Sequence, residues 1–322
     1  MNLYRSAFIF GFVSSAITLW WAGKYVGLIP LALLALLHGL FYLLLGLLGK
    51  YTKGIYWFIP ALLAIEELRS FFPFGGFSWM RIGFSQADAP YVRLASVGGV
   101  SLLTLATLLL GIAAYLLAQR GSGLTLPIIA ITLTLSGIFV FPNNSPRPTF
   151  QVLAVQGSVP KLGLDFNERA TEVFYRHLTA TEKALAKGKK PALIIWPENS
   201  VDVDPFNNPK VGTAITELVD KNDVPLIIGA VLRTDGKLQN ASILFEPEIG
   251  ATTNYVKRHL TPFGEVMPLR SILTFFSDLP NQVEDFTAGE SPVIHQVGQA
   301  KMAPIICFEL IDDRLVQSSA GS

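Results

Sequence analysis

The chain has 322 residues, of which 51% are hydrophobic and 15% charged, and its formal net charge is +1. This charged fraction lies well below the roughly one quarter that is typical of soluble domains, so the composition argues against a single soluble body. The nearly neutral chain has no block of basic residues and no interleaving of basic and aromatic residues, so the sequence indicates no nucleic-acid partner.

The N-terminal part contains apolar stretches long enough to cross a membrane as helices, for which about 18 residues are needed. There are five of them, at residues 7–23, 26–49, 55–72, 94–118 and 124–141. They predict a multi-span α-helical membrane domain over residues 1–142. A signal peptide is the alternative for the first stretch, but no small-residue cleavage site follows it. The basic residues of the connecting segments are almost evenly divided, so the charge leaves the orientation open.

Two ionisable residues lie three positions apart in the third apolar stretch. Glu66 and Arg69 share one face of the predicted helix and can pair there. Such a pair could lie near the membrane surface or could line a functional cavity. The segment 73–93 that follows is rich in glycine and aromatic residues, and it predicts an irregular loop at the membrane interface with Trp79 and Phe84 as anchors.

The second half of the chain has the pattern of an α/β domain. A linker rich in proline and turn residues is predicted at residues 143–149, and the domain at 150–322. Apolar strands alternating with helices indicate βαβ units. The strands are predicted at 150–159, 191–198, 224–230 and 302–307, the helices at 166–188 and 211–222, and an antiparallel pair of strands at 241–247 and 253–260.

Residues whose side chains could take part in catalysis follow two of these strands. Glu198 lies at the carboxyl end of one strand and Cys307 at the end of another, with Lys257 and Glu265 between them in the sequence. Catalytic groups of α/β sheets gather at the carboxyl ends of strands, so one pocket can hold all four side chains. Glu198 could take the thiol proton as a general base, and Lys257 could stabilise the thiolate and a tetrahedral oxyanion. This set is sufficient for acyl transfer.

Other interpretations compete with this one. Cys307 is the only cysteine, and a lone cysteine at a strand end is more often a packing residue of the core. A Cys–His pair with His259 or His295 as the base is a further possibility, although neither histidine has a local context that indicates it. The four histidines are scattered along the chain, so we predict no metal site, and we expect no cofactor.

The motifs around these residues resemble the nitrilase superfamily, and with the preceding apolar stretches they resemble the apolipoprotein N-acyltransferase family over essentially the whole chain. The helix that carries Glu66 and Arg69 fits the family's helix before its signature loop. The motifs are Trp196-Pro197-Glu198, Lys257 with Pro262-Phe263-Gly264-Glu265, Cys307-Phe308-Glu309, and a signature loop similar to residues 75–79 and 83–86.

The resemblance implies a fold and a set of site residues. The second domain is expected to be an αββα sandwich with a Glu-Lys-Cys triad. Glu198 would be the general base, Lys257 the oxyanion stabiliser and Cys307 the nucleophile. The positions expected to support the site are Glu265, Glu309, Trp196 and Phe308.

The resemblance also implies a reaction and a location. Cys307 would take an acyl chain from a membrane phospholipid as a thioester. The N-terminal amine of a diacylglyceryl-cysteine apolipoprotein would then attack this thioester, without any cofactor. The protein would be a multi-pass protein of the bacterial inner membrane, with its catalytic domain on the periplasmic side.

Two functional alternatives stay open at this stage. A membrane-tethered amidase of the nitrilase type would use water as the second substrate. A catalytically inactive membrane scaffold would catalyse no reaction. Because the family usually has more spans before the enzyme domain and further elements after the cysteine, we expect this chain to be a fragment. The sandwich is accordingly expected to be incomplete at its C-terminus.

Overall fold

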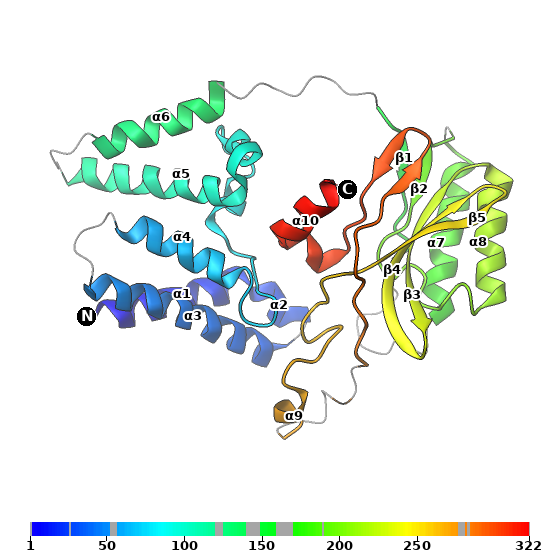
Figure 1. Ribbon diagram of the computed structural model, residues 1–322, viewed down its shortest axis with the longest axis horizontal. Helices are drawn as coiled ribbons and strands as arrows, with labels where there is room; N and C mark the ends of the chain where they lie inside the picture. The colour runs from blue at the N-terminus through cyan, green and yellow to red at the C-terminus, as the bar shows by residue number, and fades with distance from the viewer. Residues whose placement is uncertain are drawn as a thin grey trace. The chain divides into compact units, whose positions relative to one another are not determined.

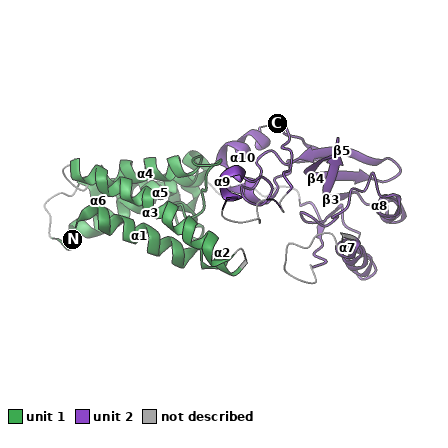
Figure 2. Ribbon diagram, turned by 90° about the horizontal axis from the view of Figure 1, so that it is seen from below, with its two compact units in different colours: residues 1–146 green, residues 147–322 purple. Residues whose placement is uncertain are grey.

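The computed structural model (Figure 1) describes residues 2–25, 27–51, 57–119, 125–139, 149–158, 170–188, 190–275, 281 and 284–321. The chain divides into two compact units, Met1–Pro146 and Arg147–Ser322, which are coloured separately in Figure 2. Residues 143–148 of the predicted linker lie outside the described residues. Each unit is described by itself below.

The first unit is built of helices. Two helical segments, Leu28–Tyr51 and Val92–Ala118, are long and apolar enough to cross a membrane, whereas two further apolar helices are shorter. All five predicted stretches therefore form helices, but only two of them have spanning length in the described part of the chain. The helices are α1 (Leu3–Thr18), α2 (Trp20–Tyr25), α3 (Leu28–Tyr51), α4 (Phe58–Arg69), α5 (Ala95–Ala118) and α6 (Thr125–Phe139).

In the first unit, the first predicted helix is divided in the structure and the third ends early. The first stretch is divided at Leu19, where α1 ends and α2 follows. Helix α4 ends at Arg69, three residues before the predicted end at 72, and the Phe77 backbone N–H donates a hydrogen bond of 2.8 Å to the Arg69 carbonyl. Gly76 then approaches the Ser70 backbone so closely that a Cβ atom on it would lie 2.2 Å from the Ser70 carbonyl carbon. Only glycine fits there.

The buried polar residues of this unit connect its helices to the loop after α4. The Glu66 carboxylate, which we expected could pair with Arg69, instead accepts hydrogen bonds from the Ile82 backbone N–H at 2.8 Å and from the Thr104 hydroxyl at 3.0 Å. Trp79 packs edge-to-face against Trp21, with their ring centroids 5.4 Å apart. Glu66 thus ties α4 to the loop and to α5.

The second unit is a mixed sheet with helices and a separate hairpin. The sheet has the strand order β1-β2-β3-β4-β5, in which β1, β2 and β3 are parallel and β3, β4 and β5 are antiparallel. Its strands are β1 (Val152–Ala154), β2 (Leu193–Ile195), β3 (Leu226–Thr234), β4 (Lys237–Glu246) and β5 (Gly250–Val256). The other elements are the hairpin β6 (His295–Val297) and β7 (Ala300–Met302) and the helices α7 (Ala170–Leu185), α8 (Pro209–Asn222), α9 (Arg270–Leu273) and α10 (Asp313–Ala320).

Alternate residues of the strands face two different layers, as the period of a strand requires. Ile194 and Ile228 belong to the core that includes α7 and α8 residues such as Phe174 and Ile215. Leu193, Ile227 and Leu244 pack with Val297 of the hairpin on the opposite face. Helices, sheet and hairpin are therefore three successive layers, with α7 and α8 together on one face in Figure 1.

The bounds of the predicted strands differ from the observed ones, most clearly for three of them. Strand β1 covers only Val152–Ala154 of the predicted 150–159, and β3 extends to Thr234 instead of ending at 230. The predicted strand 302–307 is wrong: the β6–β7 pairing ends at Met302, so residues 303–306 have no ladder partner there. Cys307 instead begins a 3₁₀ helix, Cys307–Ile311.

Candidate active site

The loop after β2 is fixed by Trp196. This side chain is 2% exposed, and its indole N–H donates a hydrogen bond of 2.8 Å to the Thr181 hydroxyl of α7. The next turn passes so close to β3 that a Cβ atom on Gly229 would lie 2.4 Å from the Pro197 carbonyl oxygen. Glu198 therefore leaves the carboxyl end of β2 from a well-anchored backbone, as predicted from the sequence.

Three of the predicted residues meet in one cluster of charges. The Lys257 ammonium nitrogen lies 2.7 Å from Glu265 Oε2 and 3.5 Å from Glu198 Oε1. It also donates a hydrogen bond of 3.1 Å to the Thr261 hydroxyl. The Asn240 side-chain amide donates to both carboxylates, at 2.6 Å to Glu198 and at 2.7 Å to Glu265. Strands β4 and β5 thus bring Asn240 and Lys257 to the same place.

The two carboxylates of this cluster have different surroundings. Burial alone would raise the pKa of Glu265, but hydrogen bonds from Lys257, Asn240 and the Thr261 backbone outweigh it, so that the pKa is lowered. The Glu198 side chain is 29% exposed, whereas that of Glu265 is 11% exposed. Glu265 is therefore held as the ionised partner of Lys257, and Glu198 is the carboxylate that faces an opening.

Cys307 and Glu198 both line one cavity. The cavity has a volume of about 370 Å³ and is mostly apolar, with Trp196, Ile227 and Ile306 also in its wall. The cysteine is exposed, so it is not the core packing residue of the simpler interpretation. Desolvation and the negative charge of Glu198 raise the pKa of its thiol, and the Lys257 charge opposes them. Glu198 and Lys257 therefore both act electrostatically on the Cys307 sulfur.

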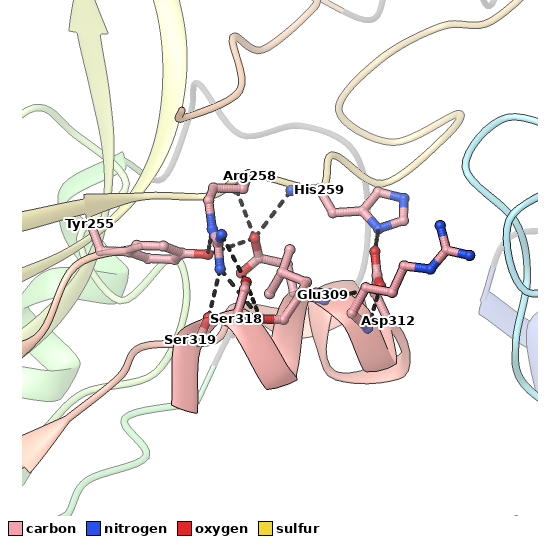
Figure 3. A network of polar contacts seen from close by, with 9 residues as sticks. Tyr255, Arg258, His259, Glu309, Asp312, Ser318 and Ser319 are labelled. Atoms are coloured by element: carbon pink, nitrogen blue, oxygen red, sulfur yellow. Dashed lines mark hydrogen bonds and ion pairs between the residues drawn. The ribbon is translucent and has the colours of Figure 1, made fainter. Parts of the chain in front are cut away.

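Glu309 stabilises the turn that carries Cys307 through hydrogen bonds (Figure 3). Glu309 is fully buried and lies outside the Lys257 cluster. One of its oxygens accepts hydrogen bonds from the Tyr255 hydroxyl at 2.7 Å and from the backbone N–H groups of Arg258 at 2.7 Å and His259 at 3.1 Å. The other accepts from the Ile306 N–H at 2.8 Å. Cys307 has a left-handed φ of 51°, a conformation that needs such support.

The neighbouring residue Phe308 is also buried, and its ring meets the His259 ring edge-to-face with centroids 5.3 Å apart. His259 Nδ1 is hydrogen-bonded to Asp312 at 3.0 Å. The other candidate base, His295, is buried with its two ring nitrogens on Ser242 and Thr253, and burial lowers its pKa to about 4. Both rings therefore form hydrogen bonds with residues other than Cys307.

Sequence reasoning missed several residues of this site. Asn240 and Thr261 contact the charged cluster, and Tyr255 and Arg258 belong to the network behind the cysteine. A signal for Asn240 existed, because asparagine is depleted in strands and a buried one needs polar partners. Within the described residues, no group of three or more histidine, cysteine, aspartate or glutamate side chains could hold a metal ion.

Two family models match the chain on either side of the unit boundary. The carbon-nitrogen hydrolase model matches residues 152–317, which is more than half of the chain. The model of the apolipoprotein N-acyltransferase N-terminal domain matches residues 2–113. The chain therefore belongs to the carbon-nitrogen hydrolase family.

The chain is also similar to individual proteins of known name. The apolipoprotein N-acyltransferase of Mycolicibacterium smegmatis is 30% identical over 97% of this chain and 59% of its own length. That of Agrobacterium fabrum is 29% identical over 94% of this chain and 63% of its own length. Among solved structures, an amidase from Nesterenkonia sp. is 12% identical over 53% of this chain and 60% of its own, with a TM-score of 0.37. The chain is thus similar to apolipoprotein N-acyltransferases along most of its own length, and it spans about 59% of the length of the first of these relatives.

Proposed function

We propose that this protein transfers an acyl chain from a membrane phospholipid to the N-terminal amine of a diacylglyceryl-cysteine apolipoprotein. One observation carries the proposal: an exposed, solitary thiol shares a cavity with a carboxylate that borders a buried lysine. The relatives' names supply the substrate class, because this geometry alone is compatible with any acyl transfer.

The first half of the reaction forms a thioester. Because the pKa of Cys307 is raised, its thiol rests protonated at neutral pH and needs a base. Glu198 takes the thiol proton while the sulfur attacks the ester carbonyl carbon of the phospholipid. The Lys257 ammonium stabilises the negative charge that develops on the carbonyl oxygen. The carbon–oxygen ester bond then breaks, and the lysophospholipid alkoxide takes the proton back from Glu198.

The second half transfers the acyl chain to the amine. The neutral α-amino group of the apolipoprotein cysteine attacks the thioester carbonyl, and Glu198 accepts the proton that the amine loses. The carbon–sulfur bond breaks, and the proton returns to the Cys307 sulfur as the amide is released. Glu265 keeps Lys257 aligned through its 2.7 Å ion pair. Trp196, Phe308 and Glu309 act as supports of the two loops.

A membrane location supports this choice of substrates, because both are anchored in lipid. We propose a multi-pass domain of about five spans at residues 1–142, a linker at 143–149 and a catalytic domain at 150–322 on the periplasmic side of a bacterial inner membrane. Two helices of spanning length support this arrangement. The segment before residue 276 also presents apolar side chains that suit a lipid surface, namely Phe263, Leu269, Ile272 and Phe275, which are all more than half exposed.

The proposal is tested by acyl transfer in vesicles that carry the protein, a labelled phospholipid and a diacylated lipopeptide. The Cys307→Ala variant should transfer no label, while Cys307→Ser should retain little. Equal transfer by the parent and Cys307→Ala would reject the role of this cysteine. An amidase would release free fatty acid or ammonia without forming the triacylated product, so product analysis separates the two activities.

A further inference from the structure

The guanidinium group of Arg258 makes its hydrogen bonds to residues outside the charged cluster, although Arg258 is the next residue after Lys257. Each of its three nitrogens donates a hydrogen bond, and every acceptor is a neutral oxygen (Figure 3). The bonds run to the Tyr255 hydroxyl at 3.4 Å, the Ser318 hydroxyl at 3.2 Å, the Leu315 carbonyl at 3.4 Å and the Ser319 hydroxyl at 2.6 Å.

Three of these four acceptors belong to helix α10. Leu315 and Ser319 are buried residues of this helix, so Arg258 forms hydrogen bonds with the buried face of α10 near its C-terminal end. A cation at this end also interacts favourably with the helix dipole. His259 holds the other end, because its ring contacts Asp312, the residue whose side chain caps α10 by accepting from two backbone N–H groups. Two consecutive residues thus hold both ends of one helix.

Helix α10 follows directly on the 3₁₀ turn Cys307–Ile311 that carries the thiol. Glu309 of this turn accepts hydrogen bonds from the backbone N–H groups of Arg258 and His259. The segment after β5 therefore presents Lys257 to the carboxylates on one side and holds the cysteine turn and its helix on the other.

We propose that Arg258 is a positioning residue for the acyl-transfer reaction, which sets the place of Cys307 relative to Lys257 and Glu198 by holding helix α10. This inference rests on the proposed function. The planar guanidinium offers directed donors to several acceptors at once, which a lysine ammonium on a flexible stem does not reproduce. Arg258→Lys is therefore a partial substitute, and Arg258→Ala removes the grip altogether.

The test measures the rate of thioester formation on Cys307 in vesicles, as a function of phospholipid concentration, for the full chain and its variants. A displacement of about 1 Å at a reacting centre can cost up to about 100-fold in rate. We expect Arg258→Ala to lower the limiting rate about tenfold or more and to leave the half-saturating lipid concentration within about twofold. Arg258→Lys and Ser319→Ala should fall between Arg258→Ala and the parent.

Arg176→Ala is the matched control, because Arg176 makes an exposed ion pair with Glu172 on the surface of α7. It should leave the limiting rate unchanged. The pH profile of iodoacetamide alkylation is the second measurement, and Cys307 is the only thiol that can react. The profile of Arg258→Ala should move towards lower pH, because a displaced sulfur lies farther from the negative charge of Glu198, which raises its pKa.

Several results would overturn the inference. They are an unchanged limiting rate and alkylation profile in Arg258→Ala, a higher half-saturating lipid concentration with an unchanged limiting rate, and a lower melting temperature as the only effect. Full activity in Arg258→Lys together with full activity in Ser319→Ala would also count against it. If the parent itself forms no thioester, the proposed function fails, and the alkylation profile alone then decides the role of Arg258.

Discussion

Replacing Glu309 by glutamine tests whether one buried carboxylate holds the cysteine turn. The substitution keeps the shape of the side chain but removes its charge and turns one acceptor oxygen into an N–H₂ donor. The oxygen that now accepts three hydrogen bonds can stay a carbonyl, as the amide of glutamine allows. The N–H₂ group then faces the Ile306 N–H, so that two donors meet where a bond of 2.8 Å was formed.

The magnitude follows from the four hydrogen bonds that Glu309 accepts. A bond to a charged group is worth roughly 1 kcal/mol more than a neutral one, and a stranded buried donor costs about as much again. The release of the buried charge offsets part of this loss. The net local destabilisation is on the order of 3 kcal/mol, which is about a 100-fold change at about 1.4 kcal/mol per tenfold.

Hydrogen exchange followed by mass spectrometry measures this change in the full chain, because amides that open locally exchange at rates set by the opening free energy. The peptide that contains Ile306 should exchange about 100-fold faster in Glu309→Gln, while peptides from strand β3 should not change. Glu290→Gln is the matched control, since Glu290 is exposed. Exchange of the Ile306 peptide at the parental rate would refute the assigned role of Glu309.

Three further predictions concern pH. Asp202 has a buried Oδ1 without a hydrogen-bond partner among the described residues, and burial raises its pKa to about 7. Its neutral form stabilises the fold, and this stability is lost as pH rises through 7. Asp202→Asn should therefore raise the melting temperature more at pH 8 than at pH 5, and equal gains at both pH values would contradict this reasoning. Burial and Glu309 raise the pKa of Tyr255 to about 12, so the stability of the fold should fall as pH rises from about 10 to 12. A spectroscopic tyrosinate titration of Tyr255→Phe should lack the last step. Because the pKa of Glu265 is lowered, its ionised form stabilises the fold above its ordinary pKa, and this contribution is lost as pH falls. The difference in melting temperature between the parent and Glu265→Gln should therefore shrink in acid. A constant difference would contradict the ion pair with Lys257.

The convergence of the charged residues was predictable because it follows from general rules of sheets. Glu198 comes directly after a buried parallel strand, and Lys257 directly follows the last strand of an antiparallel pair. These positions were predicted to meet, and the Lys257 ammonium nitrogen lies 3.5 Å from Glu198 Oε1 and 2.7 Å from Glu265 Oε2. The catalytic roles of these residues stay predictions.

The β3–β4 hairpin was missed although its turn has a clear signal. Asp235 and Gly236 both have positive φ values, of 50° and 78°, which suits the two-residue turn that an Asp-Gly pair favours. The sequence between the flanking apolar runs is polar, so the ends of both strands were assigned to no element. Asn240 lies in this unassigned part of β4, and the donor to both carboxylates was lost with it.

The backbone at Cys307 was beyond local pattern analysis. An apolar run that ends in cysteine predicts a strand, but Cys307 begins a 3₁₀ turn with a left-handed φ of 51°. The turn depends on Glu309, which accepts hydrogen bonds from residues about 50 positions earlier in the sequence. Contacts at such a distance along the chain leave no periodic trace in the sequence.

The central claim is that the single thiol of this protein carries an acyl group during turnover. Mass spectrometry of the protein after incubation with phospholipid and without an acceptor tests it most directly. The account predicts the added mass of one acyl chain, mapped to the peptide that contains Cys307 and released by hydroxylamine, and no such mass in Lys257→Met. Transfer of label to a lipopeptide by a protein whose Cys307 peptide never gains this mass would contradict the account.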